Sequence, residues 1–328
     1  MAPRIKLSDV AEAAGVSLAT ASRVLNNNGK VDPELASRVL AETERLGYRQ
    51  NSLARGLRRR ANTVVGAVIP DITNPFFTDL VRGVEDVVRE HGYLLVLGNS
   101  DETPEKEERY LRVLLDQQIA GLVIAPVQER SGARLAQILG DTPVVAVDRK
   151  VAGAGFDTVS LDNVAGAAAL TTHLLQRSRD IATIAGPSES TTGRERLAGF
   201  RDALAQSGAK ERTEWIMVSD YSEQGGYAAA HELFAGTWRP GALFAANNAM
   251  ALGALRAMGE LGITHRDVAM ASFDPLSWSA DPGHQVATLA VPSYEMGREA
   301  ARLLMLRVSG KNVGDARTIT LSAGAVRA

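Results

Sequence analysis

The chain has 328 residues, of which 45% are hydrophobic and 23% charged, with a formal net charge of −2 at pH 7. These values are ordinary for a globular protein, and the length predicts two or three domains with a sizeable core. Cysteine is absent, which excludes disulfides and thiolate chemistry. Because no signal-type segment and no bilayer-length apolar run occurs, we expect a cytoplasmic protein without a membrane partner.

The small net charge hides an asymmetry along the chain. Residues 1–60 carry a formal charge of +5, and the remainder carries −7. A basic end on an acidic body is typical of chains in which one module meets phosphate, as in DNA binding. An uneven surface charge without any partner would give the same numbers.

Residues 7–26 predict two short helices joined by a tight turn. The first helix has an apolar face at helical spacing, made by Leu7, Val10, Ala11 and Ala14. Gly15 permits the left-handed backbone that ends a helix, and Ser17 is a good N-cap for the second helix.

The second helix directs Ala21, Val24 and Leu25 inward. The side chains left outward are mostly small and polar with one arginine, namely Ser17, Leu18, Ala19, Thr20, Ser22, Arg23 and Asn26. Such a face fits the major groove of DNA, because arginine can donate two hydrogen bonds to guanine and Leu18 or Thr20 can meet a thymine methyl. The alternative is an ordinary helical hairpin with a solvated face.

This segment closely resembles the headpiece of the LacI family of bacterial transcription regulators, through the motif D-V-A-x-x-A-G-V-S-x-x-T-x-S-R-V-L-N. Lys6 departs from the threonine that often caps the first helix there, but Asp9 in the first turn still favours the helix dipole. The resemblance implies a DNA operator as the partner and a repressor as the most frequent function.

A third helix is expected from the N-cap Asp32 and from Pro33 to a stop at Gly47. The next short segment, 51–57, resembles the hinge helix of the same family, although Gln50 replaces the usual proline. The resemblance implies that Leu57 wedges between base pairs in the minor groove, with Asn51 and Ala54 as further DNA contacts. The alternative is a flexible linker.

From Thr63 onward, short apolar runs alternate with amphipathic stretches of helical length, which predicts buried parallel strands with crossover helices. The predicted strands are 64–69, 93–97, 121–125, 143–147, 181–185, 215–218, 242–245 and 268–273, followed by a helix over 293–309 and a strand over 318–321. The resemblance covers essentially the whole chain and implies three crossings between two lobes, which we place near Leu161, Ala290 and Thr318.

The predicted fold class is therefore α/β, with a two-lobed periplasmic-binding-protein-like core preceded by an all-α helix-turn-helix headpiece. We assign the headpiece to 1–50, the hinge helix and linker to 51–62, and an effector-binding and dimerisation core to 63–328. Within the core, lobe one is expected at about 63–160 plus 291–317. Lobe two is expected at about 162–290 plus 318–328.

A ligand site is expected between the lobes, because ligands of open α/β sheets bind beyond the carboxyl ends of the strands. Residues just after the predicted strands, several of which match effector-site positions of the family, are Phe76, Phe77, Asp148, Arg196, Tyr221, Asn247 and Asp274. Each polar residue among them could instead cap a helix or bridge loops. Asn248 departs from the aspartate usual at its position.

A sugar or sugar derivative is the expected effector, since aromatic rings cover a sugar ring while carboxylates, amide and guanidinium satisfy its hydroxyls. A purine or nucleoside is the alternative. Family members that bind purines carry an arginine where this chain has Ser190, and serine cannot supply that charged fork. Arg194 nearby could take the missing part.

Two further functions compete with a regulator, which we expect to act as a homodimer on a pseudo-palindromic site. A solute-binding protein would share the two lobes but would need a signal peptide and no headpiece. An α/β enzyme would need catalytic residues, but the sequence contains no G-x-S-x-G elbow, no P-loop and no dinucleotide-binding glycine motif after a strand. We therefore expect no catalytic residues, no cofactor and no metal.

Overall fold

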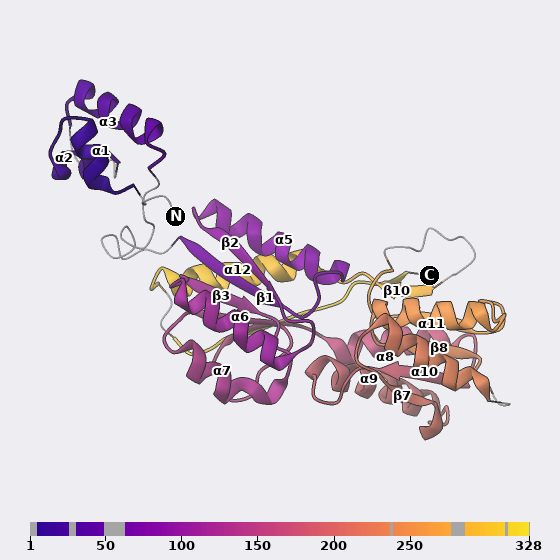
Figure 1. Cartoon of the computed structure of the whole chain (residues 1–328). Helices are drawn as coiled ribbons and strands as arrows, with labels where there is room; N and C mark the ends of the chain where they lie inside the picture. Colours follow the sequence, from indigo (N-terminus) through magenta and orange to yellow (C-terminus); the bar gives the residue numbers. More distant parts are fainter. Residues whose placement is uncertain are drawn as a thin grey trace. The chain divides into compact units, whose positions relative to one another are not determined.

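The computed structural model describes residues 5–25, 31–48, 63–236, 239–276, 286–311 and 314–327. The chain divides into two compact units, Met1–Asn62 and Thr63–Ala328, drawn in Figure 1. Asn26, Asn51, Ala54 and Leu57, four of the expected DNA contacts, lie outside the described residues.

The small unit contains three helices: α1 (Leu7–Ala13), α2 (Leu18–Leu25) and α3 (Pro33–Arg45). Its buried core consists of small and branched side chains, namely Val10, Ala11, Ala14, Ala21 and Val39. The expected helix-turn-helix is therefore present, and the third helix packs over the first two.

Side chains accept hydrogen bonds from backbone N–H groups at the start of each of these helices. The carboxylate of Asp9, in the first turn of α1, accepts from the backbone N–H of the N-cap residue Lys6 at 2.8 Å. The hydroxyl of Ser17 accepts from the N–H of Thr20 at 3.1 Å, and Asp32 accepts from two N–H groups of α3. These bonds satisfy donors that a helix start leaves free.

The turn between α1 and α2 requires glycine. Gly15 has a φ of +63°, and a Cβ there would lie 2.7 Å from Nη2 of Arg38. That nitrogen donates to the carbonyl of Ala14 at 2.5 Å, which ties α3 to the end of α1. The position of the turn thus depends on Gly15 and on Arg38.

Lobe one of the large unit contains a six-stranded sheet in the order β11-β5-β4-β3-β1-β2. Its elements are β1 (Val64–Ile69), α5 (Pro75–Glu90), β2 (Leu94–Asn99), α6 (Pro104–Asp116), β3 (Gly121–Ile124), η1 (Glu129–Ser131), α7 (Gly132–Leu139), β4 (Val144–Asp148), β5 (Asp157–Leu161), α12 (Ser293–Val308) and β11 (Thr318–Leu321). All strand pairings in this sheet are parallel.

Lobe two contains a second six-stranded sheet, in the order β12-β10-β9-β8-β6-β7. Its elements are α8 (Asn163–Leu175), β6 (Ile181–Ala185), α9 (Thr191–Ser207), η2 (Thr213–Trp215), β7 (Ile216–Val218), α10 (Glu223–Ala235), β8 (Ala242–Ala245), α11 (Asn248–Glu260), β9 (Ala269–Ser272), β10 (Val286–Leu289) and β12 (Val326–Arg327). Only β12, among the strands described in this sheet, runs antiparallel to its neighbour.

Helices cover both faces of each sheet. The pairs α5 with α12 and α6 with α7 enclose the first sheet, and α8 with α9 and α10 with α11 enclose the second. This explains why the strands are nearly continuous apolar runs, since a parallel sheet buried on both faces has no solvent side. One hydrophobic core runs from α5 and α12 through β5 to α8, and so joins the lobes.

Several parts of the sequence-based description need correction, including the strands β10 and β12 of lobe two, which were not predicted. Residues 318–328 were assigned to lobe two, but β11 pairs with β5 in the sheet of lobe one, so the third crossing lies beyond Leu321 rather than near Thr318. The strand β5 was not predicted, because Asp157, Thr158 and Ser160 give it a polar sequence. Those side chains are nevertheless buried, and Asp157 accepts two hydrogen bonds from Arg307 at 2.8 Å.

No helix in the described parts of the chain is both long and apolar enough to cross a membrane.

Candidate functional site

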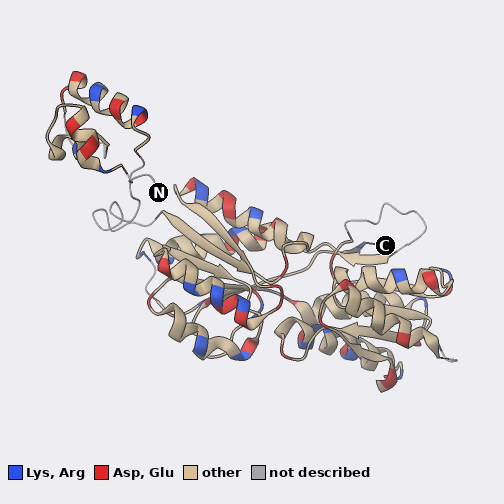
Figure 2. Ribbon diagram, in the orientation of Figure 1, with Lys and Arg blue, Asp and Glu red and all other residues tan. Residues whose placement is uncertain are grey.

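The outward face of α2 is the candidate DNA-binding surface. Ser17, Leu18, Ala19 and Arg23 are exposed, and Leu18 retains 54% of its accessible surface despite being apolar. Thr20 and Ser22 are half-buried, and the hydroxyls of Ser17 and Thr20 lie 2.8 Å apart. Arg23 is the one charged residue of α2, whereas α3 carries both acidic and basic residues along its length (Figure 2). The exposed face of α2 therefore consists mostly of neutral side chains and carries a single guanidinium group.

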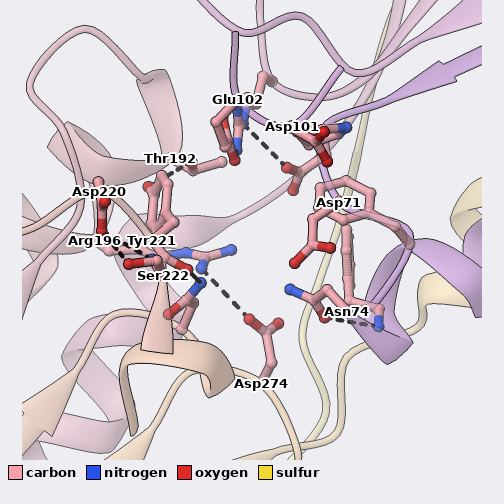
Figure 3. Close-up of a pocket in the computed structure, with 16 residues that line it drawn as sticks. Asp71, Asn74, Asp101, Glu102, Thr192, Arg196, Asp220, Tyr221, Ser222 and Asp274 are labelled. Carbon is pink, nitrogen blue, oxygen red and sulfur yellow. Dashed lines mark hydrogen bonds and ion pairs between the residues drawn. The ribbon is translucent and has the colours of Figure 1, made fainter. Parts of the chain in front are cut away.

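A cavity of about 400 Å³ lies between the two lobes of the large unit. All seven expected effector residues line it, together with others from the same loops: Pro70, Asp71, Asn74, Phe76, Phe77, Asp101, Glu102, Asp148, Arg149, Thr192, Arg196, Asp220, Tyr221, Ser222, Asn247 and Asp274. Figure 3 shows side chains from both lobes pointing into one space.

The carboxyl ends of the strands place these residues. In each lobe the strand order reverses beside the first strand, between β1 and β3 or between β6 and β8, and ligands bind at such a switch point. Asn74 and Phe76 follow β1, Asp148 is the last residue of β4, and Asp274 lies two residues beyond β9. The carboxyl ends of the strands in the two sheets thus contribute opposite walls of one cavity.

Aromatic rings form part of both walls. Phe76 and Phe77 at the start of α5 meet edge to face, with ring centroids 4.9 Å apart and an interplanar angle of 81°. Tyr221, from lobe two, has a φ of +67°, and its hydroxyl lies 2.9 Å from Oγ1 of Thr192. Gly186 makes room for that ring, since a Cβ there would lie 2.2 Å from Cζ of Tyr221.

Arg149 is held by a carboxylate of its own lobe. Its Nη1 and Nη2 donate to the two oxygens of Glu102 at 2.7 and 2.5 Å, which is the bidentate arrangement that guanidinium and carboxylate favour. The guanidinium carbon lies 5.4 Å from the ring centroid of Tyr221 in lobe two. Nε of Arg149 is buried, has no hydrogen-bond partner among the residues that the structure describes, and lies 3.8 Å from Oδ2 of Asp148.

Arg196, on α9, is held at the floor of the cavity. Its Nε donates to Oδ1 of Asn163 at 2.9 Å, and its Nη1 donates to the carbonyl of Ala246 at 2.6 Å. The guanidinium lies 3.7 Å above the ring centroid of Phe273, and Nη1 is 3.7 Å from Oδ2 of Asp274. This ion pair is drawn in Figure 3.

Two buried carboxyl groups have raised pKa values. Burial raises the pKa of Asp148 to about 6, although Arg196 and Arg149 nearby act in the opposite direction. Burial also raises the pKa of Asp274, again opposed by Arg196. Oδ1 of Asp274 has no hydrogen-bond partner within the described ranges, so a buried acceptor is available to a ligand.

Several polar contacts join the lobes around the cavity. Nδ2 of Asn248 donates to Oδ1 of Asn74 at 2.9 Å, and Nζ of Lys150 contacts Oε1 of Glu195 at 2.5 Å. Arg194 forms an ion pair with Glu129 of lobe one and donates to the carbonyl of Ser188 at 2.7 Å. Arg194 is not among the cavity-lining residues. It therefore does not supply the arginine that a purine site was expected to carry at the position of Ser190.

Several lining residues were not predicted from the sequence, although a signal existed for some of them. Two of them are next to predicted residues in the sequence, Arg149 after Asp148 and Asp220 before Tyr221, and both follow the end of a strand. Thr192 lies near the start of α9, which follows β6. Glu102 was not foreseen, because it follows β2 in a turn whose place opposite Arg149 depends on the tertiary fold. Asn248 was set aside for lacking a carboxylate, but its amide bridges the lobes.

Comparisons with known proteins agree with this architecture. The family profile described as bacterial regulatory proteins, lacI family, matches residues 6–51. The profile described as periplasmic binding proteins and sugar binding domain of the LacI family matches residues 62–323. Together the two profiles cover nearly the whole chain.

Individual relatives match over almost their full length. The ribose operon repressor of Bacillus subtilis is 35% identical over 305 residues, covering 91% of this chain and 90% of that protein. The catabolite control protein A of Priestia megaterium is 32% identical, covering 92% and 91%. The repressor CytR of Escherichia coli K12 is 29% identical, covering 94% and 91%.

Solved structures show the same fold. The transcriptional regulator CelR in complex with cellobiose has a TM-score of 0.73 and 30% identity, with 99% of each chain covered. A Lac repressor dimer bound to operator and the anti-inducer ONPF has a TM-score of 0.82 over 99% of this chain and 98% of that chain. At 22% identity, the second likeness concerns the fold alone.

Proposed function

This chain belongs to the LacI family of bacterial regulatory proteins, and we propose that a sugar bound between its lobes controls its affinity for DNA. The chain is a DNA-binding transcription regulator related to repressors, with separate DNA-binding and effector-binding domains. The effector, its effect on DNA binding and the individual contact residues are what we propose beyond that.

The exposed face of α2 is proposed to read one operator half-site in the major groove. Ser17, Leu18 and Ala19 stand at the start of this helix, where small side chains permit close approach to base edges. Arg23 is proposed to pair with a guanine. Asn26, Asn51, Ala54 and Leu57 remain DNA contacts proposed from the sequence resemblance alone.

The lining of the cavity is the observation that supports a sugar. Aromatic faces from both lobes surround a space whose polar groups are mostly hydrogen-bond acceptors, including Asp148, Asn247 and Asp274. A sugar offers the complement, since its ring carbons pack on aromatic faces and its hydroxyls donate to carboxylates. The structure of a relative in complex with cellobiose agrees with this class of ligand.

A purine or nucleoside is the second candidate, because a flat base would also stack on Phe76 or Tyr221. Reading a base would need a donor and acceptor pair aimed at its edge. Ser190 lies where purine-binding relatives carry an arginine, and its hydroxyl is engaged with Oγ1 of Thr192 at 2.7 Å. The sugar therefore fits better.

We propose that the regulator acts as a homodimer. The edge strand β2 exposes Leu94 and Val96, at 69% and 44% of their accessible surface, and Ile72 nearby is also exposed. An exposed apolar edge strand is a surface that proteins normally cover. A dimer would also bring two headpieces to two half-sites. Light scattering that shows a stable monomer would contradict this proposal.

The proposal assigns binding rather than turnover to the cavity, in line with relatives that are transcriptional repressors. It also assigns the protein to the bacterial cytoplasm, where an operator is accessible. Quantitative recovery of an unchanged ligand after prolonged incubation with the protein is the expected result, and conversion of the ligand would favour an enzyme.

The test is isothermal calorimetry of the full chain against pentoses, hexoses, disaccharides, nucleosides and free purine bases. We expect at least one sugar to bind with micromolar affinity and to change DNA binding in a gel-shift assay. Micromolar binding of a purine or nucleoside, with no response to any sugar, would overturn the proposed effector class.

A further inference from the structure

We propose that the cavity selects an uncharged polyhydroxylated ligand and rejects the phosphorylated or carboxylated form of the same carbon skeleton. This inference rests on the proposed sugar function and names its substrate class more narrowly. It follows from how the charged groups around the cavity are already paired, which the chain's membership in its family does not specify.

The formal charges of the lining are strongly unbalanced. Among the described residues that line the cavity there are two cations, Arg149 and Arg196, and six carboxylates: Asp71, Asp101, Glu102, Asp148, Asp220 and Asp274. Such a lining repels an added negative charge, and the repulsion is poorly screened where water is excluded. Binding sites for phosphate or carboxylate groups have the opposite composition, with arginine or lysine in excess.

Neither arginine presents a free fork to an anion. Both terminal nitrogens of Arg149 are occupied by Glu102, so the bidentate geometry that recognises phosphate is already used within the protein. Arg196 is bonded to Asn163 and to the carbonyl of Ala246, and its charge is paired with Asp274. An anionic ligand that took either guanidinium as a bidentate partner would compete with the carboxylate already paired to it, and a buried carboxylate left without its partner is costly.

Three of the helix N-termini beside the cavity, those of α5, α10 and α11, are occupied as well. Asn74 accepts from the N–H of Phe76 at 3.0 Å, Ser222 accepts from Gly225 at 2.9 Å, and Asn247 accepts from Met250 at 2.9 Å. These side-chain caps take N–H groups that could otherwise hold an anion. These three positive helix ends are therefore not available to offset the acidic lining, whereas the N-termini of α6 and α9 have no side-chain cap.

The groups that remain free match a hydroxyl. Oδ1 of Asp274 is a buried acceptor without a partner among the described residues, in a residue only 3% exposed, and Figure 3 shows that carboxylate directed into the cavity. Nε of Arg149 is likewise a buried donor for which the described part of the chain supplies no hydrogen-bond partner, in a residue 4% exposed, and Asp148 lies beside it. A hydroxyl both donates and accepts, so neutral hydroxyls can satisfy both groups, whereas the phosphate dianion that prevails at pH 7.5 cannot donate to Asp274.

Matched pairs of ligands test the inference directly. The wild-type full chain is titrated by calorimetry with D-ribose against ribose 5-phosphate, and with D-glucose against glucose 6-phosphate and gluconate, at pH 7.5 and constant ionic strength. We expect the neutral sugar to bind at least about ten-fold more tightly than its anionic form in the pair that binds. Equal or tighter binding of the anionic form would overturn the charge selection while leaving the sugar function standing.

A charge variant separates selection by charge from selection by shape. In Glu102→Gln, one negative charge is lost and the fork of Arg149 is released, so the preference for the neutral sugar should fall by about ten-fold or more. Glu105→Gln removes the same charge from an exposed position of α6 that does not line the cavity, and should keep the wild-type preference. An unchanged preference in Glu102→Gln would contradict the inference. Binding of nucleosides alone would overturn the sugar function, and this inference with it.

Discussion

Asn248 of lobe two donates a hydrogen bond from Nδ2 to Oδ1 of Asn74 in lobe one, at 2.9 Å, between two buried side chains. The same oxygen of Asn74 also accepts from the N–H of Phe76 and thereby caps α5. A single amide oxygen thus fixes the start of a cavity-lining helix and connects the two lobes. We therefore expect a change in lobe angle that breaks this contact to alter the position of Phe76.

The substitution Asn248→Asp tests this contact. A carboxylate cannot donate to Oδ1 of Asn74, and rotating the Asn74 amide would sacrifice the cap of α5. We expect the affinity for the tightest-binding sugar to fall by about 0.5–1.5 kcal/mol, the usual net value of one hydrogen bond. Calorimetry measures this change in sugar affinity. Asn248→Ala, which removes the donor without adding charge, serves as the control and should cost less. An affinity equal to that of the wild type in Asn248→Asp would remove the contact from the account.

The substitution Gly186→Ala tests the place of Tyr221 in the cavity. The new methyl group would overlap the tyrosine ring, because its Cβ would lie 2.2 Å from Cζ. We expect the ring to be displaced, the bond to Thr192 to be lost and sugar affinity to drop by about ten-fold or more, with sugar-free DNA binding unchanged. Gly259→Ala is the matched control, since a Cβ at that position would meet no atom within 4 Å. Normal sugar binding by Gly186→Ala would show that Tyr221 does not contact the ligand.

Sugar affinity should depend on pH through Asp148. Because burial raises its pKa to about 6, the carboxylate that accepts ligand hydroxyls is present above pH 6 and is lost as the pH falls below it. Affinity should therefore weaken between about pH 7 and pH 5. The free protein should show the opposite trend in its stability. Since the folded pKa of Asp148 exceeds the unfolded value, protonation favours the folded state, and this contribution grows as the pH falls from about 6 toward 4.

Asp148→Asn is the control for this pH dependence. Asp148 has a φ of +65°, a left-handed conformation that asparagine tolerates better than most residues, so the variant should fold. Arg149, Arg196, Glu102 and Asp274 are the charged groups nearest to Asp148. Glu107, whose pKa burial raises to about 7, lies outside the cavity lining and is unchanged in the variant. Calorimetry from pH 5 to pH 8 should give a flatter profile, and a profile like that of the wild type would assign the dependence elsewhere.

Arg23→Ala tests the base contact proposed for α2. Removing a guanidinium that pairs with guanine should cost about 1–3 kcal/mol per half-site and flatten discrimination at one base position. Binding is measured on operator variants altered base by base. Arg45→Ala, which removes an exposed charge from the end of α3, is the control. If Arg23→Ala weakens every sequence equally, Arg23 contacts phosphate.

The headpiece and the alternating strands could be predicted because local signals agree with the tertiary structure there. Ser17 and Asp32 cap the helices that they were expected to cap, and the apolar runs of both lobes form parallel strands. By contrast, β5 has a polar sequence because its buried Asp157 is neutralised by Arg307, which lies 150 residues further along the chain. No local pattern contains that partner.

The cavity was predictable only in part, for a similar reason. Positions just after strands could be read from the sequence, and all seven chosen residues do line one cavity. What each polar group does there depends on partners from distant segments, such as Glu102 for Arg149 and Asn74 for Asn248. The charge pairs on which the proposed ligand selection depends therefore could not be predicted from the sequence, because they join residues that only the fold brings together.

The most direct test of the account is the operator affinity of the full chain with and without sugar. Genome-wide mapping of bound sites supplies the operator, and fluorescence anisotropy measures its binding while the neutral sugar identified by calorimetry is titrated. A saturating sugar should change operator affinity by roughly 5–150-fold, the usual range of coupling between two sites. An operator affinity that is the same with and without the bound sugar would contradict the claim that this cavity controls DNA binding.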